Sequence, residues 1–494
     1  MATTDTATRI APLDLDADEF HVALQRVSTW IERYLEDPER FPVLPNVKPG
    51  QVAGQLPPSP PETAEPLDHI LDDYEQVILP GITHWNHPGF MAYFAISASM
   101  PGVLAEMLAA TLNVNGMLWK TSPSATELEQ RALDWLRQML GLTSGWFGII
   151  NDTASISTML AMAAAREAKP ELDVRARGLA GRTDLPTLRV YTSEHAHNSV
   201  DKAAITIGIG LDNLVHVPTD AAFAMRADAL ARLVAEDRAR GMLPIAVMAT
   251  VGTTSTASVD PIPQLVEICR REGMWLHVDA SYGGTAAIVP ELRHVLDGFE
   301  GVDSFVVNPH KWLFTPVDIS AMYTRRPDVL RRAFSLVPEF LTTVEQDQVV
   351  NLMDYGIQLG RRFRALKLWM VIRAFGVSGL VERLRTHLAL AQELAEWVRR
   401  EPGWELIAPV HFSLVCCRYA PEGKSEAELE RLNAAILARV NASGRIYLSH
   451  TKLGDRYVIR VAIGNIRTER RHVAEAWALL REAARGVHDE AVKR

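Results

Sequence analysis

Short apolar runs rich in β-branched residues alternate with longer helical patterns from about residue 88 to residue 385. Each run is followed by residues suited to a helix or a turn. The five clearest are GWFGIIN, LRVYTS, LPIAVMATVG, MWLHVDAS and VDSFVVN. Strands that are apolar throughout and lie between helices indicate a parallel sheet buried on both faces. The sequence therefore predicts an α/β fold built on a mainly parallel sheet.

A chain of 494 residues is too long for one compact core, so more than one domain is expected. Residues 17–35 have apolar positions at helical spacing and predict an amphipathic helix. The proline-rich passage that follows, Pro42 to Pro66, is either a flexible linker or an arm laid across a partner subunit. Beyond residue 385, two long helical patterns flank short strands. We therefore divide the chain into an N-terminal helical arm (1–88), a large domain (89–385) and a smaller α+β domain (386–494).

Composition argues against several classes of protein. The formal net charge is -9 with both signs scattered, which gives no reason to expect nucleic acid or an anionic membrane as a partner. Cys416 and Cys417 are adjacent, where a mutual disulfide would be strained, and neither they nor Cys269 have metal-ligand spacing. The N-terminus lacks the pattern of a signal peptide, and no stretch approaches the roughly 18 apolar residues of a membrane helix. We expect a soluble, cytoplasmic protein without a metal ion.

The strongest local motif is Val307-Asn308-Pro309-His310-Lys311-Trp312, directly after the apolar run DSFVV. It places Lys311 just beyond the end of a strand, where α/β folds build their sites. Burial there would lower the pKa of the amine by desolvation, as Schiff-base chemistry requires. Taken alone, a surface lysine that ends a strand is the simpler interpretation.

Asp279 ends a second apolar run, MWLHVD. A carboxylate buried at that position costs several kcal/mol unless it meets a positive partner. A pyridinium nitrogen is such a partner, because a protonated ring can accept electrons from a carbanion at Cα. The alternative is that Asp279 caps the following turn.

Two further motifs follow strand-like runs. Residues 152–158, DTASIST, open a helical pattern, and small hydroxyl residues at a helix N-terminus suit a phosphate, although they are ordinary N-caps as well. His195 and His197 share one face of an extended chain, which suits a metal pair geometrically. Because no set of carboxylate and cysteine ligands stands nearby, the other interpretation is that one imidazole lies on a cofactor ring.

Together these motifs resemble the group II pyridoxal-phosphate decarboxylases, in particular aromatic-L-amino-acid decarboxylase, from about Trp30 to Trp477. The most specific stretches are NPHKW, HVDASYGG, AHNSV, TSPSATELE and LGRRFRALKLW. The resemblance implies the fold-type I architecture of pyridoxal enzymes, with a large seven-stranded domain and a C-terminal domain. It also implies an obligate homodimer with active sites at the subunit interface and the N-terminal arm packed on the partner.

The resemblance also implies residue roles. Lys311 would carry pyridoxal 5′-phosphate (PLP), Asp279 would pair with the pyridine nitrogen, and His197 would stack on the ring. Further cofactor contacts are implied for Ala154, Ser155, Thr254, Asn308 and His310. The substrate pocket, shared partly with the neighbouring subunit, is implied for Trp85, Tyr93, Phe94, Gly360 and Arg460. In some relatives a glycine at the position of Gly360 goes with bulky indole substrates, which favours tryptophan and leaves DOPA, tyrosine and phenylalanine open.

The chain departs from the family pattern at three places. Asp152 replaces a glycine before the phosphate motif, and Ala95 and Ile96 replace a proline and a threonine beside the pocket. Phe340 stands where the family's catalytic loop normally carries a tyrosine, and residues 331–352 contain no tyrosine.

The phenylalanine leaves two outcomes open, because it has no proton to give to Cα and general acid catalysis is typically worth about 10²–10⁴-fold. His197 or a water could protonate Cα, giving the amine. Alternatively, the chain resembles aldehyde synthases, relatives with phenylalanine at this position, whose products are an aldehyde, ammonia and hydrogen peroxide.

Two other classes share parts of this pattern. An aminotransferase would use Lys311 and Asp279 but needs an arginine that grips the substrate carboxylate, whereas decarboxylation is helped by a poorly solvated carboxylate. A pyridoxal-sensing regulator would need a DNA-binding domain, and neither end of the chain offers one. We therefore expect a PLP-dependent carboxy-lyase acting on an aromatic L-amino acid.

Overall fold

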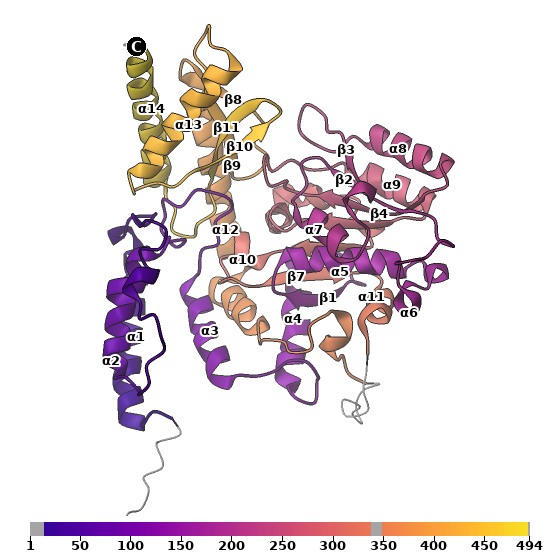
Figure 1. Ribbon diagram of the computed structural model, residues 1–494, viewed down its shortest axis with the longest axis horizontal. Coiled ribbons are helices and arrows are strands. Elements are labelled where there is room, and N and C mark those ends of the chain that lie inside the picture. The colour runs from indigo at the N-terminus through magenta and orange to yellow at the C-terminus, as the bar shows by residue number, and fades with distance from the viewer. Residues whose placement is uncertain (1–13, 337–347, 493–494) are drawn as a thin grey trace, which may run out of the picture. The chain divides into compact units, whose positions relative to one another are not determined.

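The computed structural model describes residues 14–336 and 348–492, and the chain divides into two compact units, Met1–His87 and Pro88–Arg494 (Figure 1). In the N-terminal unit, helix α1 (Ala17–Glu36) confirms the predicted amphipathic helix and begins where the side chain of Asp16 accepts a hydrogen bond from the N–H of Glu19. Arg26 of α1 forms ion pairs with Asp68 and Asp72 of α2 (Leu67–Asp73), which hold the two helices together. The proline-rich passage between them includes the short helices η1 (Pro38–Arg40) and η2 (Ala53–Gln55).

The second unit is built on a seven-stranded sheet with the strand order β1-β7-β6-β5-β4-β2-β3. Its strands are β1 (Phe147–Asn151), β2 (Leu188–Ser193), β3 (Leu214–Val217), β4 (Leu243–Thr250), β5 (Trp275–Asp279), β6 (Ser304–Val307) and β7 (Ser320–Thr324). Strands β3, β2, β4, β5 and β6 are parallel, and β7 runs antiparallel to β6 and β1. The predicted α/β fold with a mainly parallel sheet of seven strands is confirmed.

Helices cover both faces of this sheet (Figure 1). The helices in this part of the chain are α3 (Met100–Leu112), α4 (Pro123–Met139), α5 (Ala154–Glu167), α6 (Val174–Arg177), α7 (Ser199–Thr206), α8 (Ala227–Ala239), α9 (Ile262–Glu272), α10 (Pro309–Trp312), α11 (Pro327–Phe334) and α12 (Ala365–Arg400). Neighbouring residues of one strand enter different cores: Ile150 and Val247 pack with α4, α8, α9 and α12, whereas Ile149 and Ala246 pack with α5, α7 and α11. Burial on both faces explains why the central strands of the sheet are mainly apolar.

The C-terminal part forms a four-stranded antiparallel sheet with the order β10-β11-β9-β8. Its elements are β8 (Trp404–Leu406), β9 (Leu414–Tyr419), α13 (Glu426–Ala442), β10 (Ser449–Leu453), β11 (Arg456–Ala462) and α14 (Arg470–Val492). The sheet and its helices share a separate core that includes Val415, Ile436 and Ile459. Helix α12 bends at Gly376 (φ 61°) and contains residue 385, the predicted end of the large domain. The boundary between the large and the small domain stays a prediction.

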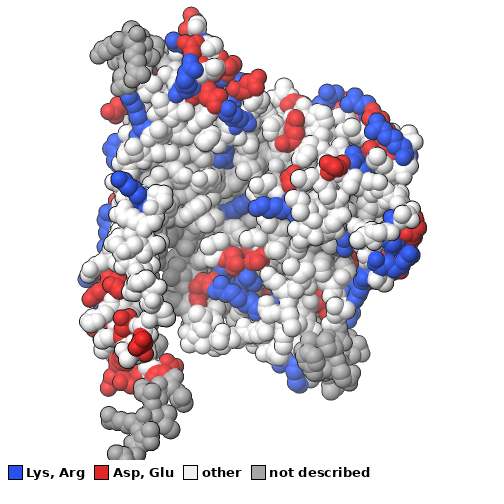
Figure 2. Space-filling model, viewed as in Figure 1, with Lys and Arg blue, Asp and Glu red and all other residues white. Residues whose placement is uncertain are grey.

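Charges of both signs are interspersed on the face shown in Figure 2. Within the described ranges, none of the helices has both the length and the apolar character needed to cross a bilayer.

Candidate active site

The carboxyl ends of the parallel strands meet at one edge of the sheet, where loops and short helices enclose a cavity of about 170 Å³. We name it the Lys311 cavity. Its lining residues are Phe94, Thr153, Ala154, Ser155, His197, Thr250, Gly252, Thr254, Asp279, Ser281, Asn308, His310 and Lys311. Every residue that the resemblance linked to the cofactor lies in this lining, so the structure brings the separate sequence motifs together.

Lys311 lies on the short helix α10, directly after β6. Its Nζ donates a hydrogen bond to Ser281 Oγ (2.9 Å) and lies 5.5 Å from the centre of the Phe94 ring. Burial lowers the pKa of Lys311, and the nearby carboxylate of Asp279 opposes that shift. A lowered pKa increases the share of unprotonated amine, the form that attacks an aldehyde carbon.

Asp279 ends β5 and is only 8% exposed. Its Oδ1 accepts a hydrogen bond from the N–H of Ser281 (3.0 Å), so the predicted turn contact exists. The carboxylate of Asp279 partly offsets the lowering of the pKa of Lys311 and of His197 by burial. No described cation forms an ion pair with this carboxylate. A buried carboxylate without an ion-pair partner suits a ligand that brings a positive charge.

The part of the cavity lining at the start of α5 suits an anion. Thr153 is the N-cap of α5, and the first N–H groups of that helix, at Ala154 and Ser155, have no partner within the helix. The amide oxygen of Asn308 is buried without a hydrogen-bond partner among the described residues. A phosphate offers acceptor oxygens, so Asn308 could serve it only through its amide N–H groups and not through this oxygen.

His195 and His197, the two histidines singled out in the sequence, lie in different surroundings. His197 lines the cavity, its Nδ1 accepts a hydrogen bond from the N–H of Ser199 (3.1 Å), and burial lowers its pKa. His195 packs edge-on against Phe223, with 5.4 Å between ring centres. In the described part of the chain, no group of three or more His, Cys, Asp or Glu side chains could hold a metal ion.

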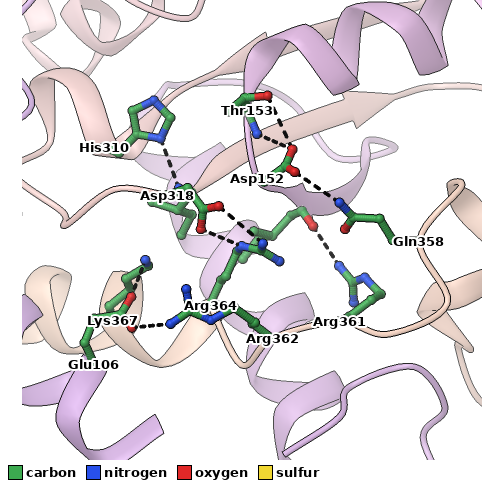
Figure 3. Close-up of polar contacts among 12 residues, drawn as sticks. Glu106, Asp152, Thr153, His310, Asp318, Gln358, Arg361, Arg362, Arg364 and Lys367 are labelled. Atoms are coloured by element: carbon green, nitrogen blue, oxygen red, sulfur yellow. Dashed lines mark hydrogen bonds and ion pairs between the residues drawn. The ribbon is translucent and has the colours of Figure 1, made fainter. Parts of the chain in front are cut away.

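His310 precedes Lys311 in α10, and its Nδ1 accepts a hydrogen bond from the N–H of Ile319 (3.0 Å; Figure 3). Burial lowers the pKa of His310 to about 3, so this ring is neutral at neutral pH.

Residues 49–420 match the family described as the pyridoxal-dependent decarboxylase conserved domain. The chain belongs to this family. It is 40% identical to tyrosine decarboxylase 2 of Arabidopsis thaliana over 488 residues, which cover 96% of this chain and 88% of that protein. It is 38% identical to phenylacetaldehyde synthase of a Rosa hybrid cultivar over 490 residues, with 96% and 95% covered. The crystal structure of Oryza sativa TDC with PLP and tryptamine superposes with a TM-score of 0.91 at 36% identity, covering 96% of this chain and 99% of that one.

As a pyridoxal-dependent decarboxylase, this enzyme uses PLP, and the Lys311 cavity fits that group. The amine of Lys311 matches the aldehyde of PLP, and the carboxylate of Asp279 matches its ring nitrogen. The N-terminus of α5 matches its phosphate. Lys311, Asp279 and the N-terminus of α5 are therefore the groups that could hold the cofactor at these three points.

The residues expected to bind substrate lie in different surroundings. Phe94 lines the cavity and stacks on Tyr282, with 3.8 Å between ring centres, whereas Tyr93 is 50% exposed. Gly360 is exposed, and a Cβ added to it would meet Asn115 Nδ2 at 3.9 Å, which leaves room for a side chain. Trp85 belongs to the N-terminal unit, and Phe340 lies outside the described residues. Arg460 is buried beside the Phe94 ring and is not part of the cavity lining.

Three lining residues were not assigned a role from the sequence: Thr250, Gly252 and Ser281. Thr250 ends β4, and Ser281 lies two residues after the end of β5, so their places at strand ends were the available signal. Ser281 matters most of these, because it accepts the hydrogen bond from Lys311.

Asp152, one of the departures from the family pattern, forms hydrogen bonds with two different segments of the chain (Figure 3). Its Oδ1 accepts a hydrogen bond from the N–H of Thr153 (2.6 Å), and its Oδ2 accepts one from Gln358 Nε2 (3.1 Å). Asp152 therefore ties the start of α5 to the segment that carries Gly360.

A buried ion pair between Arg361 and Glu129 anchors the same segment. Arg361 Nη2 lies 2.7 Å from Glu129 Oε1 and also donates to the carbonyl of Ile150 (2.7 Å). Glu129 in turn accepts a hydrogen bond from the N–H of Ile150 (2.8 Å). Both charged side chains are only 4% exposed, so neither is hydrated well enough to stand alone.

Glu129→Gln is expected to lower the free energy of unfolding by about 3–5 kcal/mol, because Arg361 would remain buried without a counter-charge. Urea-induced unfolding at one protein concentration measures this. The matched control is Glu396→Gln, which removes an exposed partner of Arg399 and should cost below about 1 kcal/mol. Equal losses in both variants would contradict the structural role given to the buried pair.

Proposed function

We propose that this enzyme removes the α-carboxyl group of an aromatic L-amino acid as CO₂ and releases the aryl amine. Tryptophan, DOPA, tyrosine and phenylalanine are the candidate substrates. The observation that carries the proposal is the Lys311 cavity, in which an amine, a buried carboxylate and the Phe94 ring lie at one sheet edge. The relatives support it, since they include a tyrosine decarboxylase and a structure with tryptamine.

The cavity residues have distinct tasks in this reaction. When bound, PLP supplies a ring that accepts the electron pair left at Cα as CO₂ departs. Asp279 would keep a proton on the ring nitrogen, and Lys311 would hold the cofactor through its amine. Because His197 Nδ1 accepts a hydrogen bond, the neutral ring carries its proton on Nε2, and a proton given to Cα from there would be replaced from water.

The test is a product balance for the holoenzyme with each of the four amino acids, in which CO₂, amine, aldehyde, keto acid and peroxide are quantified together. The proposal predicts CO₂ and amine in equal amounts for at least one substrate. A keto acid without CO₂ would mean transamination, and no turnover of any of the four would exclude the proposed substrate class.

A second candidate function rests on Phe340 and on the similarity to a phenylacetaldehyde synthase. Without the tyrosine that the family's loop normally carries, the electron pair at Cα stays available to O₂ for longer. The overall reaction then consumes the amino acid, O₂ and water and releases an aldehyde, CO₂, ammonia and hydrogen peroxide.

Phe340→Tyr is expected to raise the amine-to-aldehyde ratio, by up to about 10²–10⁴-fold if the new hydroxyl acts as a general acid. Amine and aldehyde from the variant and the unmodified enzyme are measured side by side. The control is the unmodified enzyme without O₂, which should form no peroxide. If the unmodified enzyme forms neither aldehyde nor peroxide in air, the second candidate is excluded.

We also propose a homodimer with active sites at the subunit interface, in which the N-terminal arm packs on the partner. Helix α3 supports this, because it exposes apolar side chains at four-residue spacing along one stripe: Met100 (49%), Leu104 (54%), Leu108 (52%) and Leu112 (61%). Positions four apart lie on the same face of a helix, and an apolar stripe of this length marks an interaction surface.

Leu108→Glu is expected to weaken dimerisation by about 10²-fold or more, because a carboxylate would be buried without a partner. Sedimentation or light scattering over a concentration series measures the dissociation constant. Leu211→Glu is the matched control, since Leu211 is also 52% exposed but lies outside α3. A Leu108→Glu variant that dimerises as the control does would contradict this interface.

For the compartment we propose the cytoplasm. Cys269, Cys416 and Cys417 are all free and buried. Burial raises the pKa of the Cys416 thiol to about 11, which keeps it in the unreactive thiol form. Three unpaired thiols suit a reducing compartment.

A further inference from the structure

Arg460 is a buried cation without an acidic partner. It lies in the middle of β11 and is 3% exposed. Its Nε donates to the carbonyl of Ser255 (3.0 Å), its Nη1 to Ser449 Oγ (2.8 Å), and its Nη2 to the carbonyls of Thr254 (2.6 Å) and Tyr93 (3.3 Å). No described carboxylate is paired with it. The guanidinium is therefore committed to uncharged acceptors from three separate segments.

One of those segments has an unfavourable backbone conformation. Tyr93 has φ 52°, in the left-handed region that a tyrosine rarely adopts. Arg460 holds the carbonyl of Tyr93, while Ser449 Oγ accepts a hydrogen bond from the N–H of the same residue (3.1 Å). Because Ser449 also accepts from Arg460, the two side chains form one clamp on both polar groups of Tyr93.

The clamp determines where two walls of the Lys311 cavity lie. Phe94 follows Tyr93 directly, and its ring lies 5.5 Å from the guanidinium carbon of Arg460 and 5.5 Å from Lys311 Nζ. Thr254, whose carbonyl Arg460 also binds, is a second lining residue. The position of Phe94 over Lys311 thus depends on a backbone conformation that Tyr93 would not adopt unaided.

We propose that Arg460 is a positioning residue: with Ser449 it holds Tyr93 in the left-handed conformation and so fixes Phe94 and Thr254 around Lys311. This differs from the expectation that Arg460 binds substrate. A substrate carboxylate could recruit the guanidinium only by breaking bonds that hold the cavity wall. The carboxylate is then left without an arginine grip from Arg460, a condition that favours its loss as CO₂. The inference rests on the proposed function for the identity of the substrate.

The test compares two ligands that differ only in the carboxylate, the amino acid and its product amine, in Arg460→Lys and Ser449→Ala. If the clamp positions the cavity wall, each variant should weaken the binding of the amino acid and of the amine by the same factor. For Arg460→Lys we expect an affinity about tenfold lower, the effect of losing one charged hydrogen bond. PLP added to the apoprotein and followed by absorbance should also bind more weakly, because Phe94 and Thr254 line its cavity.

Two comparisons sharpen this test. Arg418→Lys is the matched control, because Arg418 lies on the neighbouring strand β9 and pairs with Glu405 and Glu426; all affinities should stay unchanged. The effect of Ser449→Ala should shrink in a Tyr93→Gly background, since glycine adopts positive φ without help.

Two results would overturn the clamp: weaker binding of the amino acid alone, which marks a carboxylate ligand, or an unchanged Ser449→Ala variant. Failure of the proposed function is a separate outcome, seen as absence of CO₂ from the unmodified enzyme. In that case the measurements of PLP affinity would still test the clamp.

Discussion

Lys311→Ala is expected to lower turnover by on the order of 10⁴-fold or more, the scale on which removal of a nucleophile acts in other enzymes. No other lysine lines the Lys311 cavity in the described part of the chain, so no amine there can replace it. The variant should still bind PLP weakly through the anion site at α5 and through Asp279, but reversibly. Steady-state rates and the absorbance of the protein after dialysis measure both effects.

Lys424→Ala is the matched control for this variant. Lys424 is exposed and pairs with Glu428 on the surface, so its loss should leave turnover and cofactor retention unchanged. Turnover by Lys311→Ala at a rate comparable to that of the control would contradict the role assigned to this lysine.

Asp279→Asn is expected to lower turnover by about 10²–10³-fold, the range found when one preorganised electrostatic group is removed. The amide keeps the shape and can still accept the hydrogen bond from the N–H of Ser281, but it has no charge to keep a proton on the ring nitrogen. Rates for the holoenzyme, measured at saturating PLP, separate this loss from weaker cofactor binding.

The same variant has a pH signature. The carboxylate of Asp279 raises the pKa of Lys311, so its removal should lower that pKa further below the usual range of a lysine. Because the unprotonated amine reacts with an aldehyde, the rate at which apoprotein captures PLP should reach its plateau at a lower pH in Asp279→Asn. Asp228→Asn, on the surface of α8, is the control and should shift neither property. An unchanged or upward shift in Asp279→Asn would mean that the two groups do not interact as described.

The sheet could be predicted as far as its strands are buried on both faces. The five predicted runs became β1, β2, β4, β5 and β6, because helices on both sides require continuous apolar sequence. Strand β3 was missed because it is short and its middle residues are not buried. Strand β7, SAMYT, was missed because it is short and has a small polar residue at each end, although all of it is buried.

The cofactor end of the site could be predicted for a related reason. Parallel strands end at one edge, so polar residues that follow apolar runs, such as Asp279 and Lys311, must come together. The clamp could not be predicted, since it depends on the left-handed backbone of Tyr93 and on carbonyl acceptors that any residue provides. The sequence of Arg460 and Ser449 carries no sign of that geometry.

Reduction of the holoenzyme with sodium borohydride tests directly whether the amine of Lys311 holds PLP, because it fixes the cofactor covalently to the amine that carries it. After digestion, mass spectrometry should find the pyridoxyl group on the peptide that contains Lys311 and on no other lysine. A label on a different residue, or a protein that retains no cofactor after reduction, would show that Lys311 does not carry PLP.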